Sequence, residues 1–254
     1  MPEDHADQPD EAAATSEHLF PYSLAATAGF ADAFGYLKLH GLLTAHITGN
    51  LAFMAVGLAQ GSPHILMKFL ALPLFMAGVS LGTIIVTGLG RHSRLSLVWS
   101  LLMEAGLLLL CLFAGSVLPP CRFTDDLTGC CVGTLLIMSM ALQNAIMRLP
   151  LKRLPSTTAM TTNITEATVQ WTHWVIGFGR QLSPEDKRKL FGRARTFGTT
   201  VGFFGLGGVA GGLAAVRAGY LGLLAPTAVL ALLATRAAFV HREPERAAEV
   251  TRGR

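Results

Sequence analysis

Five long apolar runs constrain the fold of this chain more than any other feature of its sequence. Glu104 is the only acidic residue within them, and it lies near the middle of its run. Each run is about as long as the roughly 20 residues that a helix needs to cross a bilayer. The runs are 66–90, 95–117, 127–147, 197–216 and 219–235.

The composition agrees with a membrane protein. Of 254 residues, 51% are hydrophobic and 14% are charged, whereas about a quarter of the residues in a soluble domain are charged. We therefore expect an all-α integral membrane protein that crosses the bilayer several times.

Residues 20–40 are expected to form a further membrane helix, although this segment holds Asp32 in its interior. Pro21 suits a first helical turn, where a missing N–H costs little. The preceding residues, 1–19, contain six acidic residues and no Lys or Arg. They are expected to form a disordered tail and not a signal peptide.

Two segments are unusual because they are short or polar. Residues 47–60 would form a helix of roughly 21 Å, too short for a hydrocarbon core of about 30 Å. Residues 160–179 are long enough but carry many hydroxyl, amide and charged side chains, which are costly in lipid.

The two halves of the chain resemble each other in order and spacing. "TAHITGNL" (44–51) has a counterpart in "TTAMTTNI" (157–164), and Asp32 has one in Asn144. These matches predict a two-fold internal repeat, the first copy in 20–118 and the second in 127–240. Together they form one transmembrane domain, 20–240, followed by a cytoplasmic tail, 241–254.

The number of crossings stays open between six and eight. If the two short segments enter the membrane and return to the side from which they came, 16 Lys and Arg residues lie on one side of the membrane and 4 on the other. If all eight segments cross, the division is 13 to 7. Positive charge concentrates on the cytoplasmic side, so both termini are expected there, in the inner (plasma) membrane. Six crossings would also make the two halves inverted repeats, a plan that recurs in transporters.

The same motifs resemble a family of bacterial membrane proteins. "FADAFGYLKL" (30–39), "HITGN" (46–50) and "LQNAIMR" (142–148) are similar to the motifs of the YoaK-like family. The resemblance covers about residues 20–240. It departs from the family at His46 and Ile47 and at Thr162, where the second copy would often carry Gly. It implies a multi-span membrane protein without a settled activity.

The polar segments are candidates for a solute site. A helix that begins inside a membrane presents free N–H groups and the positive end of its dipole, and Thr and Asn side chains add donors. The alternative is that Thr and Asn simply cap helices beside a loop. The expected substrate-binding residues are Asp32, Thr48, Gly49, Asn50, Asn144, Thr161 and Asn163.

Ionisable residues inside spans are costly unless they have a partner or a role. Asp32 and Glu104 are therefore candidates for proton coupling. Glu166 follows Asn163 at the spacing of a helix-capping partner. No phosphate-binding loop and no paired Cys or His spacing occur, so no cofactor and no metal are expected.

The basic segment 180–198 is expected to lie at the cytoplasmic surface. Ser183 and Pro184 predict the start of a short amphipathic helix beside anionic lipid headgroups. The expected partners are thus the lipid bilayer and a small solute, not nucleic acid, and the sequence leaves the oligomeric state open.

Two classes of function remain. The first is a secondary transporter or permease for a small polar or anionic solute. The second is a membrane enzyme or a lipid-interacting structural protein, although no nucleophile-and-base pattern favours an enzyme.

Overall fold

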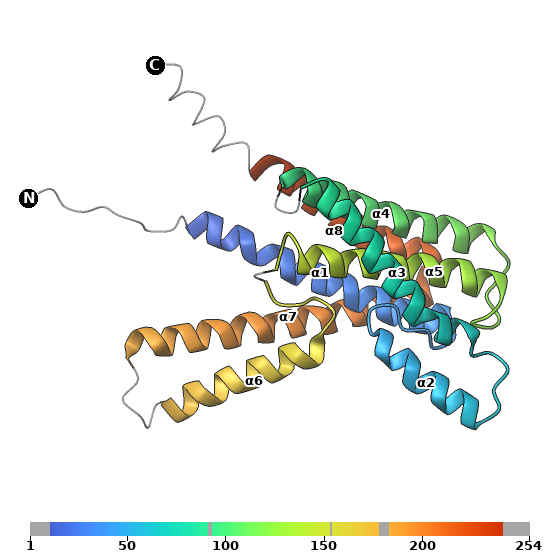
Figure 1. The fold of residues 1–254 in the computed structure, drawn as a ribbon, viewed down its shortest axis with the longest axis horizontal. Helices are drawn as coiled ribbons and strands as arrows, with labels where there is room; N and C mark the ends of the chain where they lie inside the picture. Colours follow the sequence, from blue (N-terminus) through green and yellow to red (C-terminus); the bar gives the residue numbers. More distant parts are fainter. Residues whose placement is uncertain (1–10, 91–92, 153, 178–182, 241–254) are drawn as a thin grey trace, which may run out of the picture.

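The computed structural model describes residues 11–90, 93–152, 154–177 and 183–240. Within these ranges the chain is helical and contains no strand, which confirms the expected all-α class (Figure 1). The helices are α1 (Glu11–Lys38), α2 (Ile47–Ala59), α3 (Leu66–Gly88), α4 (Arg94–Val117), α5 (Leu127–Arg148), α6 (Met160–Gly177), α7 (Pro184–Arg217), the short 3-10 helix η1 (Gly219–Leu223) and α8 (Leu224–Val240).

Five segments are long and apolar enough to cross a membrane: α3, α4, α5, α7 and η1 with α8. Large apolar side chains on their outer faces are exposed, for example Ile84 at 68%, Phe113 at 65% and Leu232 at 70%. Such a surface would be unfavourable in water and suits contact with lipid. The chain is therefore a multi-pass membrane protein.

The helix boundaries differ from expectation at two places. α1 begins at Glu11, within the expected N-terminal tail, and residues 1–10 and 241–254 lie outside the described residues. The expectation of a separate short helix after Ser183 is wrong, because α7 runs unbroken for 34 residues. Its start is as expected: Pro184 is in the first turn, and the Ser183 hydroxyl accepts a hydrogen bond from Asp186 N. No proline follows to end the helix before the apolar part begins.

Glycines allow two helix pairs to pack closely. On α7, a Cβ at Gly207 or Gly211 would overlap the α1 backbone at Ala26 or Phe30. On α3, Gly78 faces Ala141 of α5. The same pairing continues one turn further, where Gly82 faces Ala145. Residue numbers rise together in both pairs, so α7 runs parallel to α1 and α3 runs parallel to α5.

α1 and α5 run antiparallel, which defines the two ends of the bundle. At one end, the Thr124 hydroxyl before α5 donates to Leu39 O after α1. Further along, Gln143 Nε2 donates to Leu24 O. We call the end where α1 stops and α3 and α5 begin the Lys38 end. The Arg148 end is the opposite one, where α5 stops and α7 begins.

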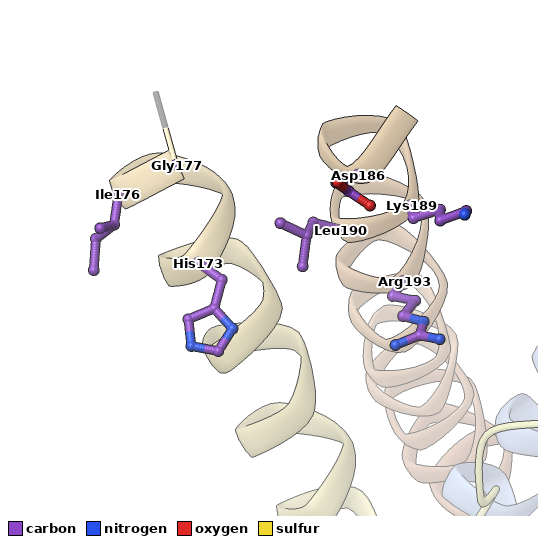
Figure 2. Close-up of a pocket in the computed structure, with 7 residues that line it drawn as sticks. All are labelled: His173, Ile176, Gly177, Asp186, Lys189, Leu190 and Arg193. Atoms are coloured by element: carbon purple, nitrogen blue, oxygen red, sulfur yellow. The ribbon is translucent and has the colours of Figure 1, made fainter. Parts of the chain in front are cut away.

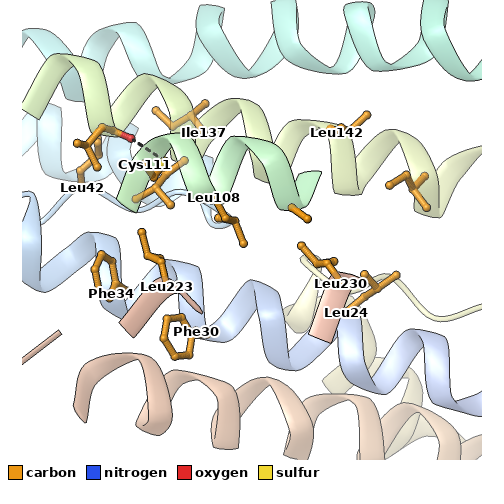
Figure 3. Close-up of a cluster of buried hydrophobic side chains, with 14 of the residues drawn as sticks. Leu24, Phe30, Phe34, Leu42, Leu108, Cys111, Ile137, Leu142, Leu223 and Leu230 are labelled. Carbon is orange, nitrogen blue, oxygen red and sulfur yellow. Dashed lines mark hydrogen bonds between the residues drawn. The ribbon is translucent and has the colours of Figure 1, made fainter. Parts of the chain in front are cut away.

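The core lies where α1, α4, α5 and α8 meet (Figure 3). Phe34 of α1 and Leu108 of α4 are fully buried in it, as are Ile137 of α5 and Leu230 of α8. This packing fixes α1 and α5, the two helices that carry the polar residues considered below.

The two short helices begin inside the bundle. After α1 the chain turns back along that helix until Thr44 reaches Asp32, six residues before Lys38. α2 then leads to α3, which begins at the Lys38 end. After α5 the chain turns back until Thr158 reaches Asn144, four residues before Arg148. α6 then leads to α7, which begins at the Arg148 end, so each short helix returns to the end from which its segment came (Figure 1).

Candidate functional site

Asp32 holds the start of α2 through its buried carboxylate. Oδ1 accepts hydrogen bonds from the backbone N–H of Thr44 (2.7 Å), Ala45 (2.7 Å) and His46 (3.3 Å). Oδ2 lies 2.5 Å from His46 Nδ1. The first N–H groups near a helix start lack partners within the helix and favour a negative charge. A carboxylate from α1 therefore satisfies donors that a solute would otherwise meet.

Asn50 closes the loop that precedes α2. Its Oδ1 accepts from Leu43 N (2.9 Å), and its Nδ2 donates to Leu43 O (2.6 Å). Gly49 leaves room for the Leu43 side chain, which a Cβ at that position would meet. We call Asp32 and residues 43–50 the first loop–helix motif.

The loop before α6 is built in a similar way. Asn144 Oδ1 accepts from the Thr158 hydroxyl (2.8 Å), and Asn163 Nδ2 donates to Ser156 O (2.5 Å). The separations in sequence are the same in both motifs. Asp32 and His46 are 14 residues apart, as are Asn144 and Thr158. Each asparagine, Asn50 or Asn163, bonds to the residue 7 positions before it. We call Asn144 and residues 156–163 the second loop–helix motif.

Met140 of α5 connects the two motifs. Its side chain packs with Ala45 of the first motif and with Ala28 and Ala31 of α1. Its carbonyl accepts a hydrogen bond from Asn144 Nδ2 of the second motif at 2.9 Å. The point where Ala45 of the first motif reaches α5 therefore lies about one helical turn from Asn144 of the second motif.

Two buried polar atoms, one beside each motif, have no hydrogen-bond partner among the described residues. They are the Thr44 hydroxyl, from the first motif, and Gln143 Oε1, on α5 beside the second motif. Gln143 uses its amide nitrogen to donate to Thr157 Oγ1 at 2.7 Å and to Leu24 O. A buried hydroxyl and a buried amide oxygen left without partners are costly, so each is available to a small polar molecule.

The two motifs differ in charge. The first pairs a carboxylate with a histidine, and the hydrogen bond to Asp32 raises the pKa of His46, while partial burial opposes the rise. The ring of His46 also meets the edge of Phe204 of α7 at a centroid distance of 5.1 Å. The second motif pairs an amide with a hydroxyl and is neutral.

The expected site residues separate into two groups. The side chains of Asp32, Asn50 and Asn163 are buried, and Asn144 is half-buried. Thr48 and Thr161, in contrast, lie on the exposed sides of α2 and α6. Neither helix begins with a threonine or asparagine cap: α2 starts at Ile47, and no side chain at His46 caps it.

Glu104 and Glu166 lie apart from both motifs. Glu104 is fully buried on α4. α6 begins at Met160, so Glu166 falls in the second turn and not at the capping position expected for it.

Four residues around the two motifs were not among the expected site residues: Thr44, Gln143, Thr157 and Thr158. A signal for Thr158 was present in the 14-residue spacing from Asn144, which repeats that from Asp32 to His46. Gln143 had no such signal, because its bonds to Leu24 and Thr157 depend on the packing of α5 against α1.

A separate pocket opens between the end of α6 and the start of α7, away from the two motifs (Figure 2). His173 and Gly177 line one side, and Asp186, Lys189 and Arg193 line the other. Across the described part of the chain, no group of three or more His, Cys, Asp or Glu side chains could hold a metal ion.

Comparison with known proteins identifies the family. Residues 20–235 match the model of a family described as "Protein of unknown function (DUF1275)". No curated protein and no solved structure matches the chain. YoaK is a member of this family, so the resemblance in the sequence motifs is confirmed. Because the match covers most of its length, the chain belongs to the DUF1275 family.

Proposed function

We propose that this protein is a secondary transporter or permease for a small polar or anionic solute, which binds between the starts of α2 and α6. The observation that carries the proposal is the position of Met140, which packs with Ala45 of the first motif and accepts a hydrogen bond from Asn144 of the second. Short helices that begin within a membrane protein are a recurrent way to present N–H groups to a solute.

The preference for an anion rests on the second motif. In the first motif, Asp32 already supplies a negative charge to the helix start. In the second motif a neutral amide, Asn144, takes the corresponding place. The start of α6 thus keeps its positive dipole end without a carboxylate beside it.

The fold supports an inverted two-fold repeat with six crossings. The first helix of each half packs against the third helix of the other: α1 with α7, and α5 with α3. α1 and α5 run antiparallel, as inverted copies would. In this proposal α2 and α6 enter from opposite sides and return, and the remaining six helical segments cross.

The charge distribution supports an orientation. The Lys38 end carries four basic residues: Lys38, Lys68, Arg122 and Arg217. Nine described basic residues lie towards the Arg148 end: Arg94, Arg148, Lys152, Lys187, Arg188, Lys189, Arg193, Arg195 and Arg236. We propose that the Arg148 end and both termini face the cytoplasm of a cell whose plasma membrane holds the protein.

Labelling of single cysteines tests this topology. In a background without the four native cysteines, a cysteine at Lys152 and another at Ser183 should react with an impermeant reagent from the same face. Both positions are exposed, and α6 lies between them. Reaction from opposite faces would mean that α6 crosses, and the six-crossing proposal would fail.

Uptake into proteoliposomes tests the function. Labelled small anions and neutral polar solutes should be offered with and without a proton gradient. We expect at least one solute to accumulate in a way that depends on the protein. Binding without uptake would favour the alternative, a membrane enzyme or lipid-interacting protein, and the absence of both would contradict the proposal.

A further inference from the structure

Four polar side chains lie in the apolar core with oxygen atoms that have no partner among the described residues. They are Thr27 of α1, Ser100 and Glu104 of α4, and Ser139 of α5. Their exposed fractions are between 0% and 2%. Both carboxylate oxygens of Glu104 are among these atoms.

The hydroxyl groups of this set bond differently from those of several threonines on α6, α7 and α8. Six helical threonines of the described chain donate to the carbonyl four residues earlier, as Thr168 does to Ile164 and Thr227 does to Leu223. This is the usual bond for a hydroxyl in an apolar helix. The Thr27, Ser100 and Ser139 hydroxyls do not make it. Their oxygens thus stay available to something other than their own helix.

The contact between α4 and α5 places Glu104 beside Ser139. Cys111 Sγ of α4 donates to Val132 O of α5 at 3.8 Å (Figure 3). α4 runs towards the Lys38 end and α5 runs away from it. Glu104 and Ser139 are each seven residues from this contact, a distance of about 10 Å along either helix. Seven residues make almost two full turns, so Glu104 lies on nearly the same face of α4 as Cys111, and Ser139 on nearly the same face of α5 as Val132. Ser100 lies one further turn along that face of α4.

The contact between α1 and α5 places Thr27 at the same level. Gln143 meets Leu24, and Met140 packs with Ala28. Because the helices are antiparallel, Thr27 is level with residues 139 and 140 of α5. Three helices therefore bring Thr27, Glu104 and Ser139 to one level of the core, and Ser100 lies one helical turn away.

The charge of Glu104 is not balanced by a basic side chain nearby. The helices packed against α4 are α3, α5, α8 and η1. Their titratable residues are Lys68, Cys130, Cys131, Arg148, Tyr220 and Arg236. Lys68 lies over the Phe53 ring, Tyr220 packs on Gly115, and Arg148 and Arg236 are exposed. Cys130 and Cys131 lie near the start of α5, two turns or more from Ser139.

We propose that Thr27, Ser100, Glu104 and Ser139 form a buried site for a monovalent alkali cation of the size of Na⁺. Carboxylate and hydroxyl oxygens are ligands that hard cations prefer. One carboxylate balances one positive charge, whereas a divalent ion would leave a net charge in the core. A proton competes with the cation because it neutralises the same carboxylate. The site itself is independent of the proposed transport, but a role as the coupling ion rests on that function.

Binding of radioactive sodium to the purified full-length protein tests the site. At about pH 8, chosen to limit competition from protons, we expect saturable binding that non-radioactive Na⁺ displaces and choline does not. Na⁺ should also raise the thermal unfolding temperature. Glu104→Gln keeps the shape of the side chain and should abolish both effects. Ser139→Ala should weaken binding about tenfold.

Thr168→Ala is the matched control, since its hydroxyl is exposed and bonds to its own helix. This variant should bind Na⁺ as the parent does. The proposal is overturned if the parent neither binds Na⁺ nor gains stability from it, or if Glu104→Gln behaves like the parent. Should Glu104→Gln not fold, the parent and Ser139→Ala decide the question.

Failure of the sodium site and failure of the proposed transport give different experimental results. Loss of the sodium site with normal solute uptake would overturn this inference alone. Sodium binding in a protein that takes up no solute would leave the cation site in place and remove the transporter.

Discussion

The two loop–helix motifs share their hydrogen-bond geometry and differ in their charge. In each, a residue of a long helix holds the loop 14 residues later, and an asparagine closes that loop over 7 residues. In the first motif the holding residue is Asp32, bonded to three backbone N–H groups and to His46. In the second it is Asn144, bonded to the Thr158 hydroxyl.

Because of this difference in charge, we expect the first motif to contribute more to the stability of the protein and the second to contribute more to solute binding. The carboxylate of Asp32 satisfies the donors at the start of α2, so the first motif is closed by the protein itself. The amide of Asn144 supplies no charge, so the start of α6 keeps its attraction for an anion. We therefore expect changes in the first motif to cost more stability than the same changes in the second.

The largest expected effect is that of removing the two holding side chains. Asp32→Ala leaves three backbone N–H groups, two of them buried, and a histidine without their acceptor, and it should lower the free energy of unfolding by about 3–5 kcal/mol. Asn144→Ala should lower it by about 1 kcal/mol. Unfolding in mixed micelles with increasing SDS measures both. Equal losses would show that the charge of Asp32 adds nothing to stability.

Introducing the side chains of the first motif into the second tests the comparison further. Asn144→Asp places a carboxylate opposite the Thr158 hydroxyl, where no histidine can balance its charge. This change should lower the free energy of unfolding by about 2 kcal/mol at neutral pH. Adding Thr158→His should recover about 1 kcal/mol or more of that loss, because residues in contact couple. A double-mutant cycle on unfolding measures the coupling. Strict additivity would mean that the second motif cannot adopt the arrangement of the first.

The pH dependence of stability gives a smaller effect. The Asp32 hydrogen bond raises the pKa of His46 in the folded state above its ordinary value of 6.5. The stabilisation is therefore complete below that ordinary pKa and is lost as the pH rises through the folded pKa. We expect the stability difference between the parent and His46→Gln to be about 1 kcal/mol at acidic pH and to shrink above neutrality.

Thr158→Val is the control for this titration. The Thr158 hydroxyl does not ionise, so its loss should cost the same at every pH between about 5 and 9. A difference for His46→Gln that grows with rising pH would contradict the assignment of a raised pKa.

Much of the fold could be predicted from the sequence. The apolar runs gave helices close to α3, α4, α5 and α8, because a membrane requires about 20 apolar residues for each crossing. The shortness of 47–60 predicted a helix that could not cross alone, and α2 has only 13 residues. The matched positions of Asp32 and Asn144 pointed to the residues that hold the two loops.

The remaining features depend on packing that no local pattern specifies. The sequence placed Thr48 and Thr161 in the site, but their side chains lie on the exposed sides of α2 and α6. Asn50 and Asn163 bind their own loops, which is nearer to the capping role than to solute binding. Gln143 and Met140 lie beside the two motifs only because α5 packs against α1 and against the loop that precedes α2.

Solute affinity in variants of both motifs tests the central claim most directly. With a solute found in the uptake panel, Asp32→Asn, Asn144→Ala and the double variant should be compared with the control Thr168→Ala at equal folding. We predict that Asn144→Ala weakens binding by about 1–3 kcal/mol and that Asp32→Asn strengthens the binding of an anion, because it removes a negative charge beside the site. The double change should not be additive, and the control should bind as the parent does. Unchanged affinity in both single variants would contradict a shared site.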